Sequence, residues 1–451
     1  MGLRRGPSTR PGRSRVGRHR ALAAARWLMP SALASVLALA GLMGPADAGP
    51  GQDPAGGLPW HLTRIHADGA WHESRGRGVI VAVVDSGVEV GHEDLAGRIV
   101  GQAGCIGAGG DADRCGGTGH DDDGHGTHVA GIVAASADNG PGAVGVAPEA
   151  SLLAVRVLER RCDQGACVVG GSGSDVAAGI RWAVREGAHV INLSLGNTVS
   201  RTLGTDFDLA IEEAWSAGAV VVLAAGTGLA AAPLAPDSPA IIVTATTRED
   251  GRPAYTGPPE PTGHPARFGM AAPGGEPGDS PETCTTQPLG VRSTYVRDGQ
   301  ATYGCLAGTS MAAPHVAGAA ALLRGIGLDA DETRSVLLAT ADDLGEPGPD
   351  EVFGAGRLHV ARAVEQGLAV VAAKPAEPAP VPDQVSPLAT VPAVTVAKTR
   401  PLPPPSATEP PVPGVAGEKR ADGGRLVAGA GAAVLAAGTG ASAWRVRRRQ
   451  R

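Results

Sequence analysis

Residues 308–318 read GTSMAAPHVAG and place a serine hydroxyl where it could act as a nucleophile. Ser310 follows a glycine turn and precedes a small-residue helix, predicted for residues 312–323 with Pro314 in its first turn. Unpaired N–H groups and the helix dipole favour negative charge there, which suits a nucleophile whose attack creates an oxyanion. The three residues GTS alone would be explained more simply as an ordinary serine cap on a buried helix. A nucleophile therefore needs a base and an orienting group from elsewhere in the chain.

Two other segments offer these groups. Residues 79–84 (VIVAVV) are continuously apolar, which is typical of a parallel strand buried on both faces, and Asp85 follows them. Functional groups gather at the carboxyl ends of strands in open α/β sheets, although an acidic turn residue is the plainer interpretation. His125 begins the segment HGTHVAGIVAA, which enters a second small-residue helix. The aspartates at 121–123 and the nearby His120 are interpreted as a solvated loop, so we assign no metal site.

The elements that must position these residues alternate between strands and helices. This alternation predicts a doubly wound α/β fold, with a mostly parallel sheet and helices on both faces. The expected strands cover residues 79–84, 151–158, 189–195, 219–224 and 240–245, and the expected helices residues 175–186 and 206–217. A Pro/Gly-rich insertion, at about residues 252–300, precedes the serine helix, and helices at 330–339 and 360–366 follow it.

The charge distribution argues against a nucleic-acid partner. Eight arginines lie in residues 1–48 and five in residues 445–451, which leaves between them 26 basic and 44 acidic residues. Aromatic residues make up only 3% of the chain, so an aromatic platform for bases is not expected either. The acidic middle is best explained as keeping an exported domain soluble.

The ends of the chain indicate export and anchoring. Residues 1–48 combine an arginine-rich start, an apolar run and Ala46-Asp47-Ala48, which predicts a cleaved secretory signal peptide, with an uncleaved anchor as the alternative. A short N-terminal extension (49–78) precedes the main domain (79–370), and a Pro-rich linker (371–424), a transmembrane helix (425–444) and a basic cytoplasmic tail (445–451) follow it. We therefore expect a single-pass protein of the cell membrane with its main domain outside. Because the span is rich in Ala and Gly, a loosely held anchor or a helix-packing segment is the alternative.

All six cysteines lie after the signal peptide, within irregular insertions. Disulfides are the natural interpretation of such cysteines in an exported chain. Although 15 connectivities exist for six cysteines, we prefer local pairing: Cys105 with Cys115, Cys162 with Cys167, and Cys284 with Cys305.

The segments VAVVDSGV, DGHGTHVAG and GTSMAAPHVAG, in this order, resemble the three active-site blocks of the subtilisin family of serine proteases. The resemblance covers about residues 60–370. It implies a subtilisin-like fold, no cofactor, and hydrolysis of a protein or peptide substrate. In that mechanism Ser310 attacks the scissile carbonyl and His125 transfers the proton. Asp85 holds the imidazole in the required tautomer.

The resemblance also assigns residues around this triad. Ser194, Leu195 and Gly196 correspond to the edge strand that pairs with the substrate backbone. Thr227 stands where the family has the asparagine that donates to the oxyanion, beside the backbone N–H of Ser310. A threonine reaches less far than an amide, so we expect a slow and narrow protease. His128 and His315 resemble positions that pack the helices rather than react.

The whole layout resembles the mycosins, membrane-anchored subtilases of type VII secretion systems, and implies secretion-machine proteins as partners. A competing hypothesis is a structural component that braces a secretion complex with weakened catalysis. Thr227 favours it, whereas the intact triad opposes it. A third hypothesis, a general nutrient-degrading exoprotease, is disfavoured by the predicted anchor.

Overall fold

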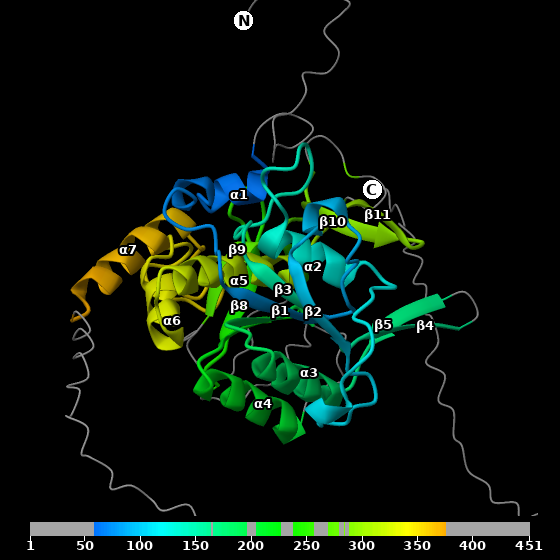
Figure 1. The fold of residues 1–451 in the computed structure, drawn as a ribbon. Helices are drawn as coiled ribbons and strands as arrows, with labels where there is room; N and C mark the ends of the chain where they lie inside the picture. Colours follow the sequence, from blue (N-terminus) through cyan, green and yellow to red (C-terminus); the bar gives the residue numbers. More distant parts are fainter. Residues whose placement is uncertain are drawn as a thin grey trace, which may run out of the picture. The chain divides into compact units, whose positions relative to one another are not determined.

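The computed structural model describes residues 58–163, 166–195, 204–226, 238–256, 269–278, 284 and 288–375 (Figure 1). The predicted signal peptide, transmembrane helix and tail lie outside these residues, as do the predicted linker beyond residue 375, Gly196 and Thr227. Within the part of the chain that is described, no helix combines the length and the apolar character needed to span a membrane.

A seven-stranded sheet forms the centre of the fold, with the strand order β2-β3-β1-β6-β7-β8-β9 and parallel pairing throughout. The central strands β6 and β7 are buried along their whole length, as a sheet covered on both faces requires. The strands are β1 Ile80–Asp85, β2 Ile99–Gly104, β3 Ser151–Arg156, β6 Val190–Leu193, β7 Val220–Ala224, β8 Ile241–Thr246 and β9 Gly269–Pro273.

Helices cover both faces of this sheet (Figure 1). On one face, α2 (His125–Ala134) and α5 (Thr309–Gly325) pack into a core with apolar residues of β1, β7 and β8. On the other face, α3 (Gly173–Arg185) and α4 (Gly204–Ser216) pack into a second core. The predicted doubly wound α/β architecture is therefore confirmed.

The terminal helices join the α5 side of the molecule. These are α1 (Trp60–Arg64), α6 (Ala330–Ala339) and α7 (Val360–Ala373), and residues of all three belong to the core that contains α5. Helix α7 continues past residue 370, where we placed the end of the domain. Short 3₁₀ helices cover Asp68–Ala70, Glu93–Leu95, Ala112–Arg114 and Ala254–Thr256.

The two edge strands, β2 and β9, differ from expectation. The sequence predicts no strand at 99–104 and an irregular insertion at about 252–300, which is wrong for residues 269–273 and 291–297. Strand β2 (IVGQAG) alternates exposed and half-buried residues over most of its length, so it lacks the apolar run that marks a central strand. Both strands are defined by pairing with a neighbour rather than by their own composition.

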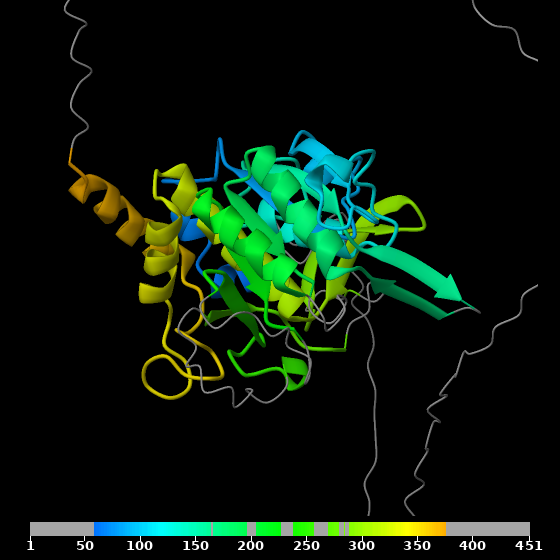
Figure 2. The same cartoon turned by 90° about the horizontal axis from the view of Figure 1, so that it is seen from below.

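Two antiparallel hairpins accompany the sheet. One pairs β4 (Glu159–Asp163) with β5 (Ala166–Gly170), and the other pairs β10 (Val291–Arg297) with β11 (Gln300–Leu306). Both views show the β4–β5 hairpin projecting from the body (Figures 1 and 2).

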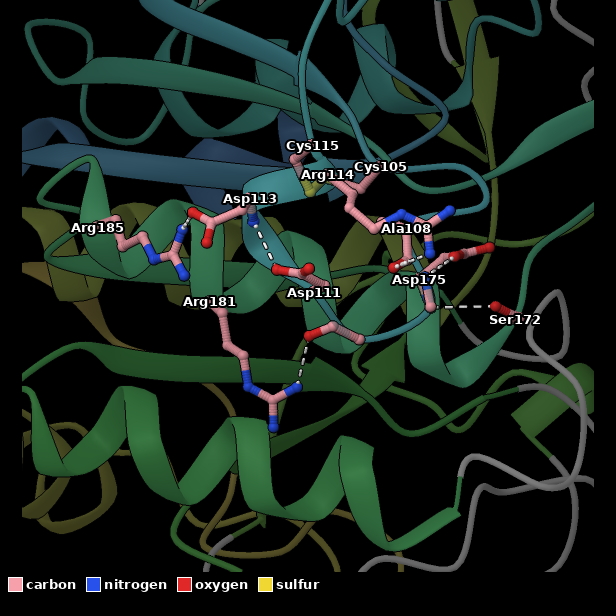
Figure 3. The surroundings of a disulfide bond; sticks show 12 residues. Cys105, Ala108, Asp111, Asp113, Arg114, Cys115, Ser172, Asp175, Arg181 and Arg185 are labelled. Carbon is pink, nitrogen blue, oxygen red and sulfur yellow. Dashed lines mark hydrogen bonds and ion pairs between the residues drawn. A yellow bond between two sulfur atoms is a disulfide. The ribbon is translucent and has the colours of Figure 1, made fainter.

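The structure joins the six cysteines in three local pairs, Cys105–Cys115, Cys162–Cys167 and Cys284–Cys305. The second pair links opposite residues of the β4–β5 hairpin. The first closes a loop that also bonds to α3 (Figure 3), where Arg181 donates to the Gly110 carbonyl at 3.0 Å and the Gly109 N–H donates to Asp175 at 3.0 Å.

Candidate active site

Asp85 is the last residue of β1 and is completely buried. Its Oδ1 accepts the N–H of Ser86 at 2.7 Å and lies 2.7 Å from Nδ1 of His125. Because a carboxylate only accepts, Nδ1 of His125 must carry the proton of this bond. Nε2 is thereby left as the basic nitrogen of the neutral ring.

A buried aspartate shapes the loop that presents His125. Asp121 is 1% exposed, and its two oxygens accept bonds from the loop and from the start of α2. The donors are the N–H groups of Asp123, Gly124 and Thr127 and the hydroxyls of Ser86 and Thr127, at 2.6–3.0 Å. Our interpretation of 121–123 as a solvated loop was therefore wrong for Asp121. Asp122 is exposed and pairs with Arg156 at 2.8 Å.

Gly126 allows α2 to approach the end of β1. A Cβ at this position would lie 2.1 Å from the carbonyl oxygen of Gly87 and 3.2 Å from Cβ of Asp85. Only glycine avoids this overlap with backbone, and the close approach brings His125 within hydrogen-bonding distance of Asp85. The sequence signal is the glycine directly after the histidine in HGTH, whose role is visible only in the folded chain.

The electrostatics of the site favour the protonated imidazole. Burial lowers the pKa of His125, but the charge and hydrogen bond of Asp85, with the charges of Asp123 and Asp121, outweigh it and raise the pKa to about 9. Burial in turn raises the pKa of Asp123. The ring is thus prepared to hold the positive charge that proton transfer from a nucleophile creates.

Ser310 is the second residue of α5, because the helix begins at Thr309 rather than at Ala312. Its Oγ donates to the Ser194 carbonyl at 3.0 Å, and the Ser194 hydroxyl donates back to the Ser310 carbonyl at 2.8 Å. Asn192 supports this exchange by donating to the Ser194 hydroxyl at 2.9 Å.

Pro314 lies inside α5, so its predicted place in the first turn was wrong. In an α-helix, the N–H of residue 314 would bond to the carbonyl of residue 310. Proline lacks that N–H, which leaves the Ser310 carbonyl free to accept from the Ser194 hydroxyl. The proline therefore helps to attach the turn that carries Ser310 to the end of β6.

The fold gathers the three sequence-predicted residues at one end of two adjacent strands. Val83 of β1 lies opposite Asn192 of β6, so Asp85 is level with Ser194, the residue that holds Ser310. Asp85 and His125 are directly bonded. Across the described part of the chain no hydrogen bond joins His125 to Ser310, whose hydroxyl is directed to the Ser194 carbonyl.

The assigned substrate and oxyanion positions are only partly described. Ser194 and Leu195 are buried directly after β6, whereas Gly196 lies outside the described residues. Thr227 also lies outside them, but the N–H of Gly226 donates to the Thr309 hydroxyl at 3.1 Å. The chain that leads to Thr227 is thus attached to the start of α5.

One group of side chains has metal-ligand chemistry that our sequence reasoning did not single out. Within the described residues, ligand atoms of His66, Asp342 and His359 lie within 4.8 Å of one another. The Asp342 carboxylate, however, already pairs with the guanidinium groups of Arg357 and Arg362. Two cations on the only carboxylate oppose a third, so we assign no metal role to this group.

Comparison with known proteins identifies the family of this chain. Residues 76–356 match the Subtilase family. The chain belongs to the subtilase family. Among its relatives, thermitase of Thermoactinomyces vulgaris is 38% identical over 67% of this chain and 94% of that protein. Subtilisin DY of Bacillus licheniformis is 34% identical over 68% of this chain and 99% of that protein.

A solved protease structure from Pseudoalteromonas arctica is similar to this subtilase, with a TM-score of 0.57 and 32% identity. The match covers 71% of this chain and all of the other. The family and the fold that the sequence motifs imply are therefore confirmed.

Proposed function

We propose that this subtilase is a membrane-anchored, extracellular serine endopeptidase that uses Asp85, His125 and Ser310. The observation that carries the proposal is the 2.7 Å bond between buried Asp85 and His125, with Ser310 held at the end of the neighbouring strand. The family supports the same chemistry, since its relatives named above are proteases.

The mechanism begins when Ser310 Oγ turns from the Ser194 carbonyl to His125. Oγ attacks the carbonyl carbon of the scissile peptide, and its proton passes to Nε2 of His125. Asp85 stabilises the imidazolium through Nδ1–H. Nε2 then returns the proton to the leaving amine, which departs as the acyl-enzyme forms. Water attacks the acyl-enzyme by the same proton transfers and releases the second product.

The oxyanion of the tetrahedral intermediate is stabilised by the N-terminus of α5 and the N–H of Ser310. We assign the second donor to the hydroxyl of Thr227, which follows the segment attached to Thr309. Loss of the usual amide donor slows turnover by about 10²–10³ in a subtilisin. Thr227 recovers part of that loss, so the enzyme is slow. Substrate pairs by strand addition with Ser194, Leu195 and Gly196.

The sequence layout supports a role resembling that of the mycosins, in which the catalytic domain acts beside a type VII secretion system. The second candidate function, a bracing component of such a complex with weakened catalysis, is favoured by the threonine at 227. Membrane attachment is tested by fractionating cells that express the full chain or a chain ending at residue 424. Only the full chain should sediment with membranes.

Labelling with a fluorophosphonate probe separates the two functions. Full-length protein should be labelled, whereas Ser310→Ala should not, and Thr227→Asn should be labelled and should turn over a peptide ester faster. Absence of labelling in folded wild-type protein would support the bracing component instead. Equal rates for wild type and Thr227→Asn would refute the assignment of Thr227 as an oxyanion donor, but they would not affect the assignment of the triad.

A further inference from the structure

A pair of buried histidines connects the N-terminal helix to the helix that carries Ser310. His61 lies on α1 and is 1% exposed, and His315 lies on α5 and is completely buried. Nδ1 of His61 is 2.8 Å from Nε2 of His315, and the rings meet edge to face. Nδ1 of His315 is 2.8 Å from the carbonyl oxygen of Met311, the residue after Ser310.

Hydrogen-bond chemistry determines where the protons of this pair lie. The Met311 carbonyl can only accept, so Nδ1 of His315 carries a proton. Burial lowers the pKa of His315 to about 4, so at neutral pH the ring is neutral and its Nε2 is an acceptor. His61 must therefore donate from Nδ1. The result is a row of two hydrogen bonds: His61 donates to His315, and His315 donates to the Met311 carbonyl beside Ser310.

Contacts other than these two hydrogen bonds hold the helix α1 in place. Trp60 donates from Nε1 to the Gly290 carbonyl at 3.1 Å, just before β10. Leu62 is completely buried in the same core as α5. His61 is thus presented to His315 from a segment that packing already fixes.

Packing alone does not account for a histidine at this position. Nε2 of His61 is buried and makes no hydrogen bond of good geometry within the described residues, although the Arg292 backbone lies close enough to the ring to oppose the lowering of its pKa. A poorly satisfied buried polar atom is unfavourable. A phenylalanine would fill a similar space without that cost. What a histidine adds is the Nδ1–H donor for His315.

We propose that His61 is a positioning residue for the nucleophile. By donating to His315 it fixes the ring that holds the Met311 carbonyl, and so it fixes the first turn of α5 with Ser310. The inference rests on the proposed function, and it assigns a positioning role to one residue of the segment that precedes the catalytic domain. His61 touches neither substrate nor Ser310 and acts only through His315.

Three variants of the full-length protein test this role. His61→Phe keeps a ring but removes the donor, whereas His61→Asn keeps an N–H donor near the position of Nδ1. Trp60→Phe is the matched control, because it removes a bond of the same helix without touching His315. Each variant is compared with wild type for peptide-ester kinetics, fluorophosphonate labelling and amide hydrogen exchange of residues 308–318.

We expect His61→Phe to lower kcat and the labelling rate about tenfold, which is about 1.4 kcal/mol of activation free energy, with KM unchanged. Hydrogen exchange in residues 308–318 of His61→Phe should be faster. His61→Asn should restore most of the lost kcat and labelling rate, and Trp60→Phe should leave both near the wild-type values. Wild-type values in folded His61→Phe, or no recovery in His61→Asn, would overturn the proposal. If wild type itself is inactive, the proposed function fails, and hydrogen exchange alone decides the positioning role.

Discussion

Replacing Asp85 by asparagine tests the charge arrangement of the site most directly. The asparagine has nearly the same shape, but it removes the negative charge and offers an N–H where His125 needs an acceptor. The carboxylate is buried and bonds to the imidazole at 2.7 Å, so water cannot replace it. The change therefore affects both the pKa of His125 and its tautomer.

The magnitude follows from the pKa of His125. Raising it from 6.5 to about 9 despite burial takes about 3 kcal/mol of net interaction with the imidazolium. Asp85 provides the largest favourable part. Because the imidazolium forms during attack by Ser310, losing this interaction should slow the reaction on the order of a hundredfold. An asparagine N–H facing Nδ1 favours the tautomer with Nε2 protonated, which cannot accept the serine proton, so the loss should be larger still.

The assay is the second-order rate of fluorophosphonate labelling from pH 6 to 10. In the wild type the rate should rise with pH toward 9, as His125 loses its second proton. In Asp85→Asn the rise should move to lower pH and the plateau should fall by at least a hundredfold. Asp122→Asn is the matched control, since this exposed carboxylate lies three residues before His125 and pairs with Arg156. It should change the rate less than threefold.

A plateau within threefold of wild type in folded Asp85→Asn would refute the reasoning. So would an equal loss in Asp122→Asn, because the effect would then belong to the general charge of the loop. If the plateau falls while the pH dependence stays where it is in the wild type, the loss comes from the tautomer of His125 and not from the lost charge of Asp85. The pKa argument would then be wrong even though Asp85 matters.

Two further predictions concern stability. Gly126→Ala should lower the free energy of unfolding by about 1–3 kcal/mol and slow labelling, because its Cβ meets the Gly87 carbonyl; Gly116→Ala, with nothing within 4 Å of its Cβ, should be nearly neutral. Thermal unfolding checks both, and equal melting temperatures would contradict the packing argument. Burial lowers the pKa of His128 to about 3 and that of His315 to about 4. At these two rings the unfolded chain therefore binds more protons below pH 6.5, so their contribution to stability should be complete above that pH and be lost toward pH 4. Urea unfolding followed by tryptophan fluorescence measures this, and a free energy that stays flat from pH 7 to 5 would contradict it.

The amino-acid sequence by itself determined the chemistry and the class of fold. The buried run that ends at Asp85 and the glycine-rich surroundings of His125 and Ser310 are local patterns, so they can be read without coordinates. The apolar runs of the central strands are equally local, because a strand covered on both faces has no polar side. These features were sufficient to predict the family and a parallel sheet.

The partners of these residues were decided only by the tertiary structure. Asp121 resembles the neighbouring aspartates in sequence, yet it is buried and accepts hydrogen bonds from Ser86, directly after β1, and from α2. Pro314 and Ser194 act together although more than a hundred residues separate them, because folding brings α5 to the end of β6. His61 reaches His315 across a still longer separation. Burial and hydrogen bonding depend on which distant segments come together, and no local pattern contains that information.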